Sequence, residues 1–157
     1  MKILIFSDSH GTMQYMCEAI EKEHPDYVIH LGDHAQDAKE LSIYYRDLPI
    51  TWVKGNCDHF YDAPLTKLVT YDGKKVFLCH GHTYGVKGGL LRVVYAAKEA
   101  GADILLFGHT HIPFHDQSQE LILLNPGACG DKNYFGKPTY GIMELGQGKP
   151  IVKYDFI

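Results

Sequence analysis

The first third of the chain alternates short apolar runs with segments that are apolar on one face only. The runs with the length of strands cover residues 2–7, 27–31 and 50–54. Residues 12–23 place apolar side chains at helical spacing and stop before Pro25, and residues 35–45 predict a second helix. Because the strands are separated by helices, this part of the chain predicts parallel βαβ units.

The pattern changes in the second half, where strands follow one another more closely. Asp72-Gly73 between the apolar residues 68–71 and 75–79 is a strong β-hairpin signal. Residues 88–100 predict a helix that ends at Gly101, because glycine is common just past a helix end. Further strands are expected at residues 104–107 and near 112–116, 121–124, 139–145 and 151–156. The closely spaced strands of the tail favour antiparallel pairing.

These elements predict an α/β fold in which two mixed sheets pack face to face with helices outside. The apolar strands need cover on both faces, which this arrangement provides. With 157 residues and no linker or internal repeat, the chain is expected to form one domain over residues 1–157.

Composition narrows the function mainly by exclusion. The formal net charge of −4 gives no basic field for capturing long nucleic acid. No apolar run approaches the roughly 18 residues of a membrane span, and the apolar stretch after Met1 is too short for a signal peptide. We therefore expect a cytoplasmic protein that does not bind membranes. The four cysteines form no C-x-x-C pair and are expected to be free thiols.

Five short blocks place metal-binding side chains directly beside glycines. They are Asp8-Ser9-His10-Gly11, Gly32-Asp33, Gly55-Asn56-Cys57-Asp58, His80-Gly81-His82 and Gly108-His109-Thr110-His111. Four of the five come right after an apolar run that predicts a strand, and strand ends on one edge of a sheet converge in space. Single blocks have simpler explanations: Asp8 and Ser9 could cap a helix, and Asn56 could be a turn residue. Two imidazoles around Thr110 are much harder to explain by packing.

Taken together, the blocks predict a site for two divalent ions. Their carboxylates, amide oxygen and imidazoles favour manganese, iron or zinc over calcium, which prefers oxygen ligands only. Two ions roughly 3.5–4 Å apart can activate a water molecule and stabilise the entering and leaving oxygens of a displacement at phosphorus.

The order D-x-H, G-D, G-N-x-D, H-G-H, G-H-T-H resembles that of the calcineurin-like metallophosphoesterase superfamily. The motifs G-N-C-D and G-H-T-H-x-P are closest to its small bacterial and archaeal phosphodiesterase branch, and the match runs from Met1 to about Gly130. The resemblance implies a four-layer αββα sandwich. It also implies a phosphodiesterase that hydrolyses small phosphodiesters with two divalent ions, with Mn²⁺ the leading expectation and Ni²⁺, Fe²⁺ or Zn²⁺ as alternatives.

Carried over by position, the resemblance also implies a role for each residue of the blocks. One ion would be held by Asp8, His10 and His111. The other would be held by Asn56, His80 and His109. Asp33 would bridge the two ions, and a metal-bound hydroxide near it would be the nucleophile. Asp58 and His10 are assigned catalytic roles, with the Asp58 carboxylate expected to orient His10 by a hydrogen bond.

One position departs from the pattern of the family. Many members carry a histidine after the asparagine of the G-N block, where this chain has Cys57. A neutral thiol could donate a weak hydrogen bond to substrate, or the side chain could simply be a small one beside the site. The missing histidine disfavours a phosphomonoesterase. His82 shares the His80 turn and is, with Cys57, a candidate substrate contact.

Two other functions remain open from the sequence. The chain could be a catalytically weak or inactive protein-binding scaffold, as in the retromer subunit that resembles this family but has lost key ligands. Against this, every ligand position here holds a competent residue. The second alternative is a phosphomonoesterase. The expected partner is a small phosphodiester substrate, and the habit of the family suggests a homodimer or higher oligomer.

Overall fold

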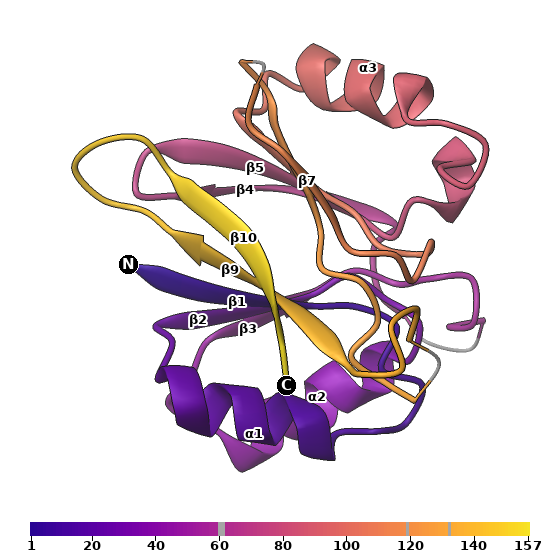
Figure 1. Ribbon diagram of the computed structural model, residues 1–157, viewed down its shortest axis with the longest axis vertical. Coiled ribbons are helices and arrows are strands. Elements are labelled where there is room, and N and C mark those ends of the chain that lie inside the picture. Colours follow the sequence, from indigo (N-terminus) through magenta and orange to yellow (C-terminus); the bar gives the residue numbers. More distant parts are fainter. Residues whose placement is uncertain (60–61, 119, 132) are drawn as a thin grey trace.

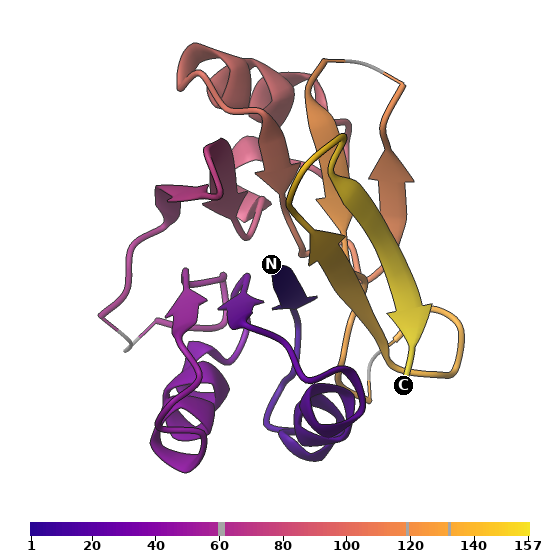
Figure 2. The same cartoon turned by 90° about the vertical axis from the view of Figure 1, so that its left-hand side faces the viewer.

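Two five-stranded sheets pack face to face, with helices covering their outer faces (Figure 1). The computed structural model describes residues 1–59, 62–118, 120–131 and 133–157. Seen after a 90° turn, the indigo and purple helices lie below one sheet and the salmon helix lies above the other (Figure 2). The expected four-layer αββα sandwich with two mixed sheets is confirmed.

The first sheet has the strand order β10-β9-β1-β2-β3. Its central strands are parallel and are joined through α1 and α2, as the apolar pattern predicted, whereas β9 and β10 run antiparallel. The strands of this sheet are β1 (Lys2–Phe6), β2 (Tyr27–His30), β3 (Ile50–Trp52), β9 (Thr139–Glu144) and β10 (Ile151–Phe156). The helices are α1 (Gln14–Glu23) and α2 (Ala35–Tyr44).

The second sheet has the order β4-β5-β6-β8-β7, with β5, β6 and β8 parallel and both edge strands antiparallel. Its strands are β4 (Thr66–Tyr71), β5 (Lys74–Cys79), β6 (Ile104–Leu106), β7 (Phe114–Asp116) and β8 (Ile122–Asn125). The hairpin at Asp72-Gly73 is confirmed, and both turn residues have positive φ, as a type I′ turn requires.

The core has three layers because each sheet is apolar on both faces. Ile5, Leu78 and Leu106 belong to the cluster between the sheets. A second cluster joins the first sheet to α1 and α2, and a third joins the second sheet to α3 (Leu91–Glu99). The described residues contain no helix that is long and apolar enough to cross a membrane. All four cysteines are free thiols, as expected.

Several element boundaries differ from the sequence-based expectation by up to three residues, and two of these differences have local backbone reasons. The helix expected from residue 88 begins only at Leu91, because Gly89 has a φ of +145°, which is incompatible with a helix. A short 3-10 helix, η1 (His82–Tyr84), precedes it. The strand expected from residue 112 begins at Phe114, directly after Pro113, which has no N–H to donate to a strand ladder.

Candidate metal centre

The five metal-binding blocks come together at the ends of five strands. Asp8 follows β1, Asp33 follows β2 and Asn56 follows β3 in the first sheet, while His80 follows β5 and His109 follows β6 in the second. β1, β2 and β3 are parallel to one another, and so are β5 and β6. Each set therefore ends at one edge of its sheet, and Figure 1 shows the loops that follow β1 and β6 on the same side of the molecule. The side chains of both sets meet in two clusters.

The first cluster consists of Asp8, His10 and His111. One potential ligand atom of each residue lies within 4.8 Å of those of the other two. The Oδ1 atom of Asp8 is fully buried and lies 3.1 Å from Nε2 of His111. Its other oxygen, Oδ2, accepts hydrogen bonds from the Ser7 hydroxyl and the His109 backbone N–H. One oxygen is thus anchored, and the other faces imidazole.

The second cluster consists of Asp33, His80 and His109, again with ligand atoms within 4.8 Å of one another. The Oδ1 atom of Asn56 lies 3.2 Å from Nε2 of His80. The Nδ1 atom of His80 lies 2.9 Å from the carbonyl oxygen of Leu31 and can only donate to it. This bond leaves the lone pair on Nε2 of a neutral ring, directed at the cluster, which is the arrangement usual for metal-binding histidines.

Asp33 lies between the two clusters. Its Oδ1 atom is 3.5 Å from Nε2 of His80, and its Oδ2 atom is 4.0 Å from Nε2 of His10. The backbone N–H of Cys57 donates to Oδ1 at 2.9 Å and fixes the carboxylate. A carboxylate with one oxygen toward each cluster fits a pair of cations. The mixed oxygen and nitrogen donor set also suits transition-metal ions better than Ca²⁺.

The backbone at these residues is unusual. Five of the proposed ligands, namely Asp8, His10, Asp33, His109 and His111, have φ values between +47° and +69°. Non-glycine residues adopt this left-handed region rarely, and where they do, the strain often accompanies a functional site. The strain here coincides with the residues that the motifs selected.

Glycines allow the loops to approach closely enough for the clusters to form. A Cβ atom on Gly108 would overlap the hydroxyl of Ser7, and one on Gly55 would overlap the carboxylate of Asp33. Gly55 and Gly108 are therefore required by the contact between neighbouring loops. This explains why the blocks combine the two residue types.

Electrostatics favours charged carboxylates at the site. Burial alone would raise the pKa of Asp8, but the hydrogen bond from His111 and the charge of His80 outweigh it, and the pKa is lowered. The pKa of Asp33 is lowered too, because contacts with His80 outweigh its burial. Burial lowers the pKa of His109 to about 4, so this ring is neutral at pH 7 and its lone pair is available.

The pKa of His80 shifts in the opposite direction from that of His109. Burial would lower its pKa, but the carboxylates of Asp33 and Asp8 reverse the effect and raise it. The most buried imidazole of the site is therefore the one that interacts most strongly with the carboxylates. Such coupling between buried groups is common at catalytic and metal-binding sites.

Residues 1–148 match the family model of the calcineurin-like phosphoesterase superfamily domain. The chain belongs to this superfamily. The probable metallophosphoesterase YsnB of Bacillus subtilis (strain 168) is 34% identical over 157 residues, covering 98% of this chain and 90% of the relative. Phosphodiesterase YfcE of Escherichia coli (strain K12) is 24% identical over 168 residues, covering 92% and 88%.

Solved structures agree with this assignment. A predicted phosphoesterase from Streptococcus pneumoniae TIGR4 superposes with a TM-score of 0.81 at 26% identity, covering 98% of this chain and 87% of the other. A Vps29 from Entamoeba histolytica superposes with a TM-score of 0.77 at 20% identity, covering 100% and 99%. Because the identity of the second structure is only 20%, its similarity shows the fold alone.

Asp58 has a different role in this chain from the expected orientation of His10. Its Oδ1 atom accepts backbone N–H groups of His34 and Ala35, and its Oδ2 atom accepts those of Asp33 and Gly55. A carboxylate has about four acceptor positions, and all are taken by these backbone donors. The expected hydrogen bond to His10 is therefore wrong. Asp58 instead ties the loop after β2 to the loop after β3.

A buried network that the sequence did not reveal supports the loop after β1. The backbone N–H of Gly32 donates to Nδ1 of His30, so Nε2 carries the proton and donates to the Ser9 hydroxyl at 3.0 Å. Ser9 in turn donates to Asp37 Oδ2 at 2.6 Å, which also accepts the N–H of Gly11. His30 itself is fully buried at the end of β2.

Asn125, at the end of β8, supports the loop after β6. Its amide nitrogen donates to the Gly108 carbonyl and to the Thr110 hydroxyl, both at 3.0 Å, and its oxygen accepts the N–H of Gly127. Asn-Pro-Gly is a sequence typical of an ordinary turn. The bonds of Asn125 instead place this turn at the edge of the site, because they hold the loop that carries His109 and His111.

The two candidate substrate contacts lie beside the second cluster. The His82 ring is 5.4 Å from that of His80 and 6.1 Å from that of His109, measured between centroids. The Cys57 thiol is exposed and lies with His10 and Asp33 in a third group of potential ligands. Burial and the hydrogen bond to Asp33 raise the pKa of Cys57 to about 11, so the thiol is neutral at pH 7.

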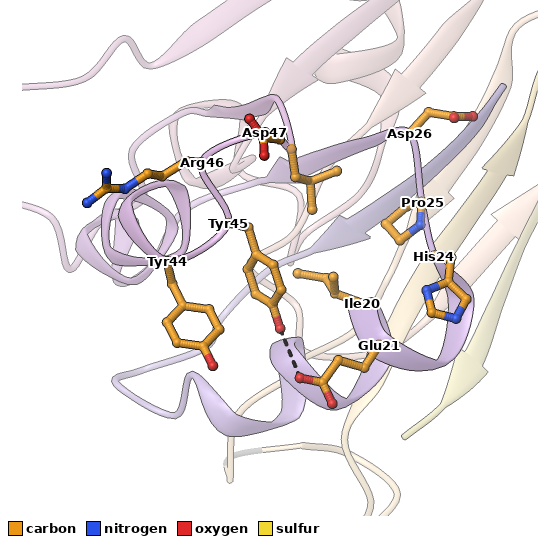
Figure 3. A pocket seen from close by; sticks show the side chains of 10 residues that line it. Ile20, Glu21, His24, Pro25, Asp26, Tyr44, Tyr45, Arg46 and Asp47 are labelled. Carbon is orange, nitrogen blue, oxygen red and sulfur yellow. Dashed lines mark hydrogen bonds between the residues drawn. The ribbon is translucent and has the colours of Figure 1, made fainter.

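A cavity lies away from this centre, between α1 and the loop after α2 (Figure 3). It measures about 670 Å³ and is lined by residues that include Glu21, His24 and Tyr45. The Tyr45 hydroxyl donates to Glu21 at 3.4 Å. Its walls include the residues just before β2 and β3, so it sits at the amino ends of parallel strands, whereas ligands in such sheets bind at the carboxyl ends.

Proposed function

We propose that this protein is a phosphodiesterase that requires two divalent ions and hydrolyses small phosphodiesters. The observation that carries the proposal is the position of Asp33, whose two carboxylate oxygens face different ligand clusters. The names of the relatives add weight, because YfcE is called a phosphodiesterase. Two ions held there would activate a water molecule and stabilise charge on the phosphate.

The residues of the site divide into proposed metal ligands and residues that position them. Asp8, His10 and His111 would hold one ion, Asn56, His80 and His109 the other, and Asp33 both. Asp58 holds the loops that carry Asp33 and Asn56, and so acts as a positioning residue. His82 and Cys57 lie at the rim, where they could contact the phosphate. Mn²⁺ is the proposed metal, in keeping with the mixed donor set.

The thiol at position 57 disfavours a phosphomonoesterase and favours substrates with good leaving groups. A general acid helps most when the leaving group is poor, and the thiol of Cys57 is a weak acid at neutral pH, with a pKa of about 11. We therefore expect substrates with good leaving groups to be hydrolysed best. A Cys57→His variant should gain most on diesters with poor leaving groups, and equal rates for both enzymes on such substrates would argue against this role.

The deciding experiment uses metal-stripped protein refilled with Mn²⁺, Ni²⁺, Zn²⁺ or Fe²⁺. Hydrolysis of bis-p-nitrophenyl phosphate and of p-nitrophenyl phosphate is followed, together with metal content per chain. We expect two ions per chain and faster turnover of the diester. Asp33→Asn should lose more than about 100-fold in kcat/KM, because even outer partners of metal ligands cost about 10- to 100-fold.

Asp47→Asn is the matched control, because it makes the same change at an exposed residue in the loop after α2. It should leave both turnover and metal content unchanged. No turnover with any of the four metals would favour the protein-binding scaffold, and faster turnover of the monoester would favour a phosphomonoesterase. A homodimer or higher oligomer stays a prediction, which sedimentation velocity can test.

A further inference from the structure

An apolar groove adjoins the metal centre on the side of the second sheet. It has a volume of about 460 Å³, and its lining includes Val86, Leu90, Phe107, Ile112 and Phe114. Phe107 and Val86 are buried and form its floor, whereas Ile112 and Phe114 are 43% and 40% exposed. Large apolar side chains that stay this exposed around a concave surface are typical of a binding site.

The groove is built from the same loops that carry the histidines of the site. Phe107 precedes Gly108-His109, and Thr110 and Ile112 flank His111. One wall of the groove is therefore formed by residues within and next to the metal-binding motif. The opposite wall, Val86 to Leu90, follows His82 and η1. Because neighbouring Cα atoms are about 3.8 Å apart, Thr110 of this groove lies one residue from both His109 and His111.

A positively charged side chain also lies at the groove. Lys87 lines the groove and is exposed. It lies on the segment that follows η1, and the ring of His82 at the start of η1 is 6.1 Å from that of His109 in the second cluster. A cation between an apolar groove and a metal site suits a molecule with an anionic head and an apolar substituent.

The dimensions favour a small molecule over a protein partner. Pockets for small molecules have volumes of about 300–1,000 Å³, which includes this groove. A stable protein partner would need about 800 Å² of contact on each side, far more than the exposed parts of Ile112 and Phe114 supply.

We propose that this groove binds an apolar ester group, aromatic or compact aliphatic, of the phosphodiester whose phosphate lies at the metal centre. The inference rests on the proposed function and adds the substrate class to it. Ile112 and Phe114 determine specificity by contact with this group, and Lys87 attracts the phosphate regardless of what the phosphate carries.

Two phosphonates that are not hydrolysed test the groove without relying on turnover. Binding of phenylphosphonate and methylphosphonate to the Mn²⁺-loaded protein is measured by calorimetry. We expect the phenyl compound to bind about tenfold more tightly, because much of a ring is removed from water. Ile112→Ser should abolish most of this preference while leaving methylphosphonate binding unchanged. Phe114→Ser is a second, independent test at an equally exposed position.

Two further variants separate the possible causes. Ile43→Ser changes an exposed isoleucine of α2, 60% exposed, and should leave the preference intact. Lys87→Gln should weaken both phosphonates by the same factor. Equal affinities in the wild type, or a preference that survives both serine variants in the groove, would overturn the proposal. If bis-p-nitrophenyl phosphate is still hydrolysed in that case, the phosphodiesterase function stands. Failure of both phosphonates to bind, with no turnover, would overturn both.

Discussion

The loops of the first sheet and the loops of the second sheet hold their parts of the metal centre by different means. In the first-sheet half, the loops after β1, β2 and β3 are tied to one another through side chains that are not ligands. Asp58 alone accepts four backbone N–H groups from two of these loops. His30, Ser9 and Asp37 connect the third loop through a buried chain of hydrogen bonds.

The second-sheet half consists of the loops after β5 and β6, which are joined by a backbone bond from the Gly108 N–H to the His80 carbonyl. Two of its bonds go to the first-sheet half, from His80 to the Leu31 carbonyl and from the His109 N–H to Asp8. Asn125 supports the Gly108–Thr110 turn from the end of β8. We expect the first-sheet half to keep its geometry before any ion binds, because its loops share acceptors. The second-sheet half should be stabilised more by the ions themselves, since bound metal stabilises the state that binds it.

The largest expected effect is that of Asp58→Ala on the first-sheet half. It leaves four backbone N–H groups without their acceptor, and an unsatisfied buried donor costs about 1–3 kcal/mol. Allowing for water that reaches the exposed part of these loops, we expect a loss of about 4 kcal/mol in the free energy of unfolding. Urea unfolding of the metal-free protein measures it. Asp47→Ala should change the free energy of unfolding little. A loss below about 1 kcal/mol for Asp58→Ala would contradict the idea that Asp58 holds the two loops together.

A pH effect of about 3 kcal/mol is expected from His30 in the same half. Burial lowers its pKa to about 4, below the unfolded value of 6.5. As the pH falls from about 6.5 to about 4, His30 becomes protonated in the unfolded chain but stays neutral in the folded chain. The free energy of unfolding should therefore decline by about 1.4 kcal/mol per pH unit and then level off with respect to this group.

Thermal unfolding of two variants isolates that contribution. His30→Asn removes the buried imidazole and should flatten the decline of stability between pH 6.5 and 4, even though it lowers stability at pH 7. His24→Asn removes an exposed imidazole with a left-handed backbone, which asparagine tolerates, and should keep the wild-type slope. Parallel slopes for the wild type and His30→Asn would show that another group governs the pH dependence.

The fold could be predicted in outline because its signals are local. Short apolar strands needed cover on both faces, and Asp72-Gly73 marked the hairpin. The start of α3 was placed three residues too early, because apolar spacing does not reveal that Gly89 adopts a positive φ. The fully apolar strands were the most informative segments.

The ligand clusters could be anticipated because carboxylates and imidazoles beside glycines are chemically distinctive. The supports could not. Ser9 and Asp37 are 28 residues apart, and no spacing rule connects them. Asp58 was correctly placed beside the site but given the wrong partner, since the choice between an imidazole and backbone N–H groups depends on loop conformation. Asn125 resembled an ordinary turn residue because its role appears only when β8 lies beside β6.

Asn125→Ala should have a smaller effect, confined to the second-sheet half. Losing the three bonds of a buried amide should cost about 2 kcal/mol in the free energy of unfolding. Calorimetric titration with Mn²⁺ should also show about 10- to 100-fold weaker binding, because the variant releases the turn that carries His109 and His111. Addition of Mn²⁺ should restore more stability to Asn125→Ala than to Asp58→Ala. The reverse order would contradict the proposed difference between the halves.

The smallest expected effect is that of Thr110→Val in the same turn. Its hydroxyl accepts hydrogen bonds from Asn125 and from the backbone N–H of Ile112, but the residue is partly exposed, so water can replace the lost partner. We expect a loss of about 0.5 kcal/mol by urea unfolding. The double variant with Asn125→Ala should lose less than the sum of the two single losses, because both changes remove the same hydrogen bond. Strict additivity would mean that Asn125 stabilises the turn only through the Gly108 carbonyl.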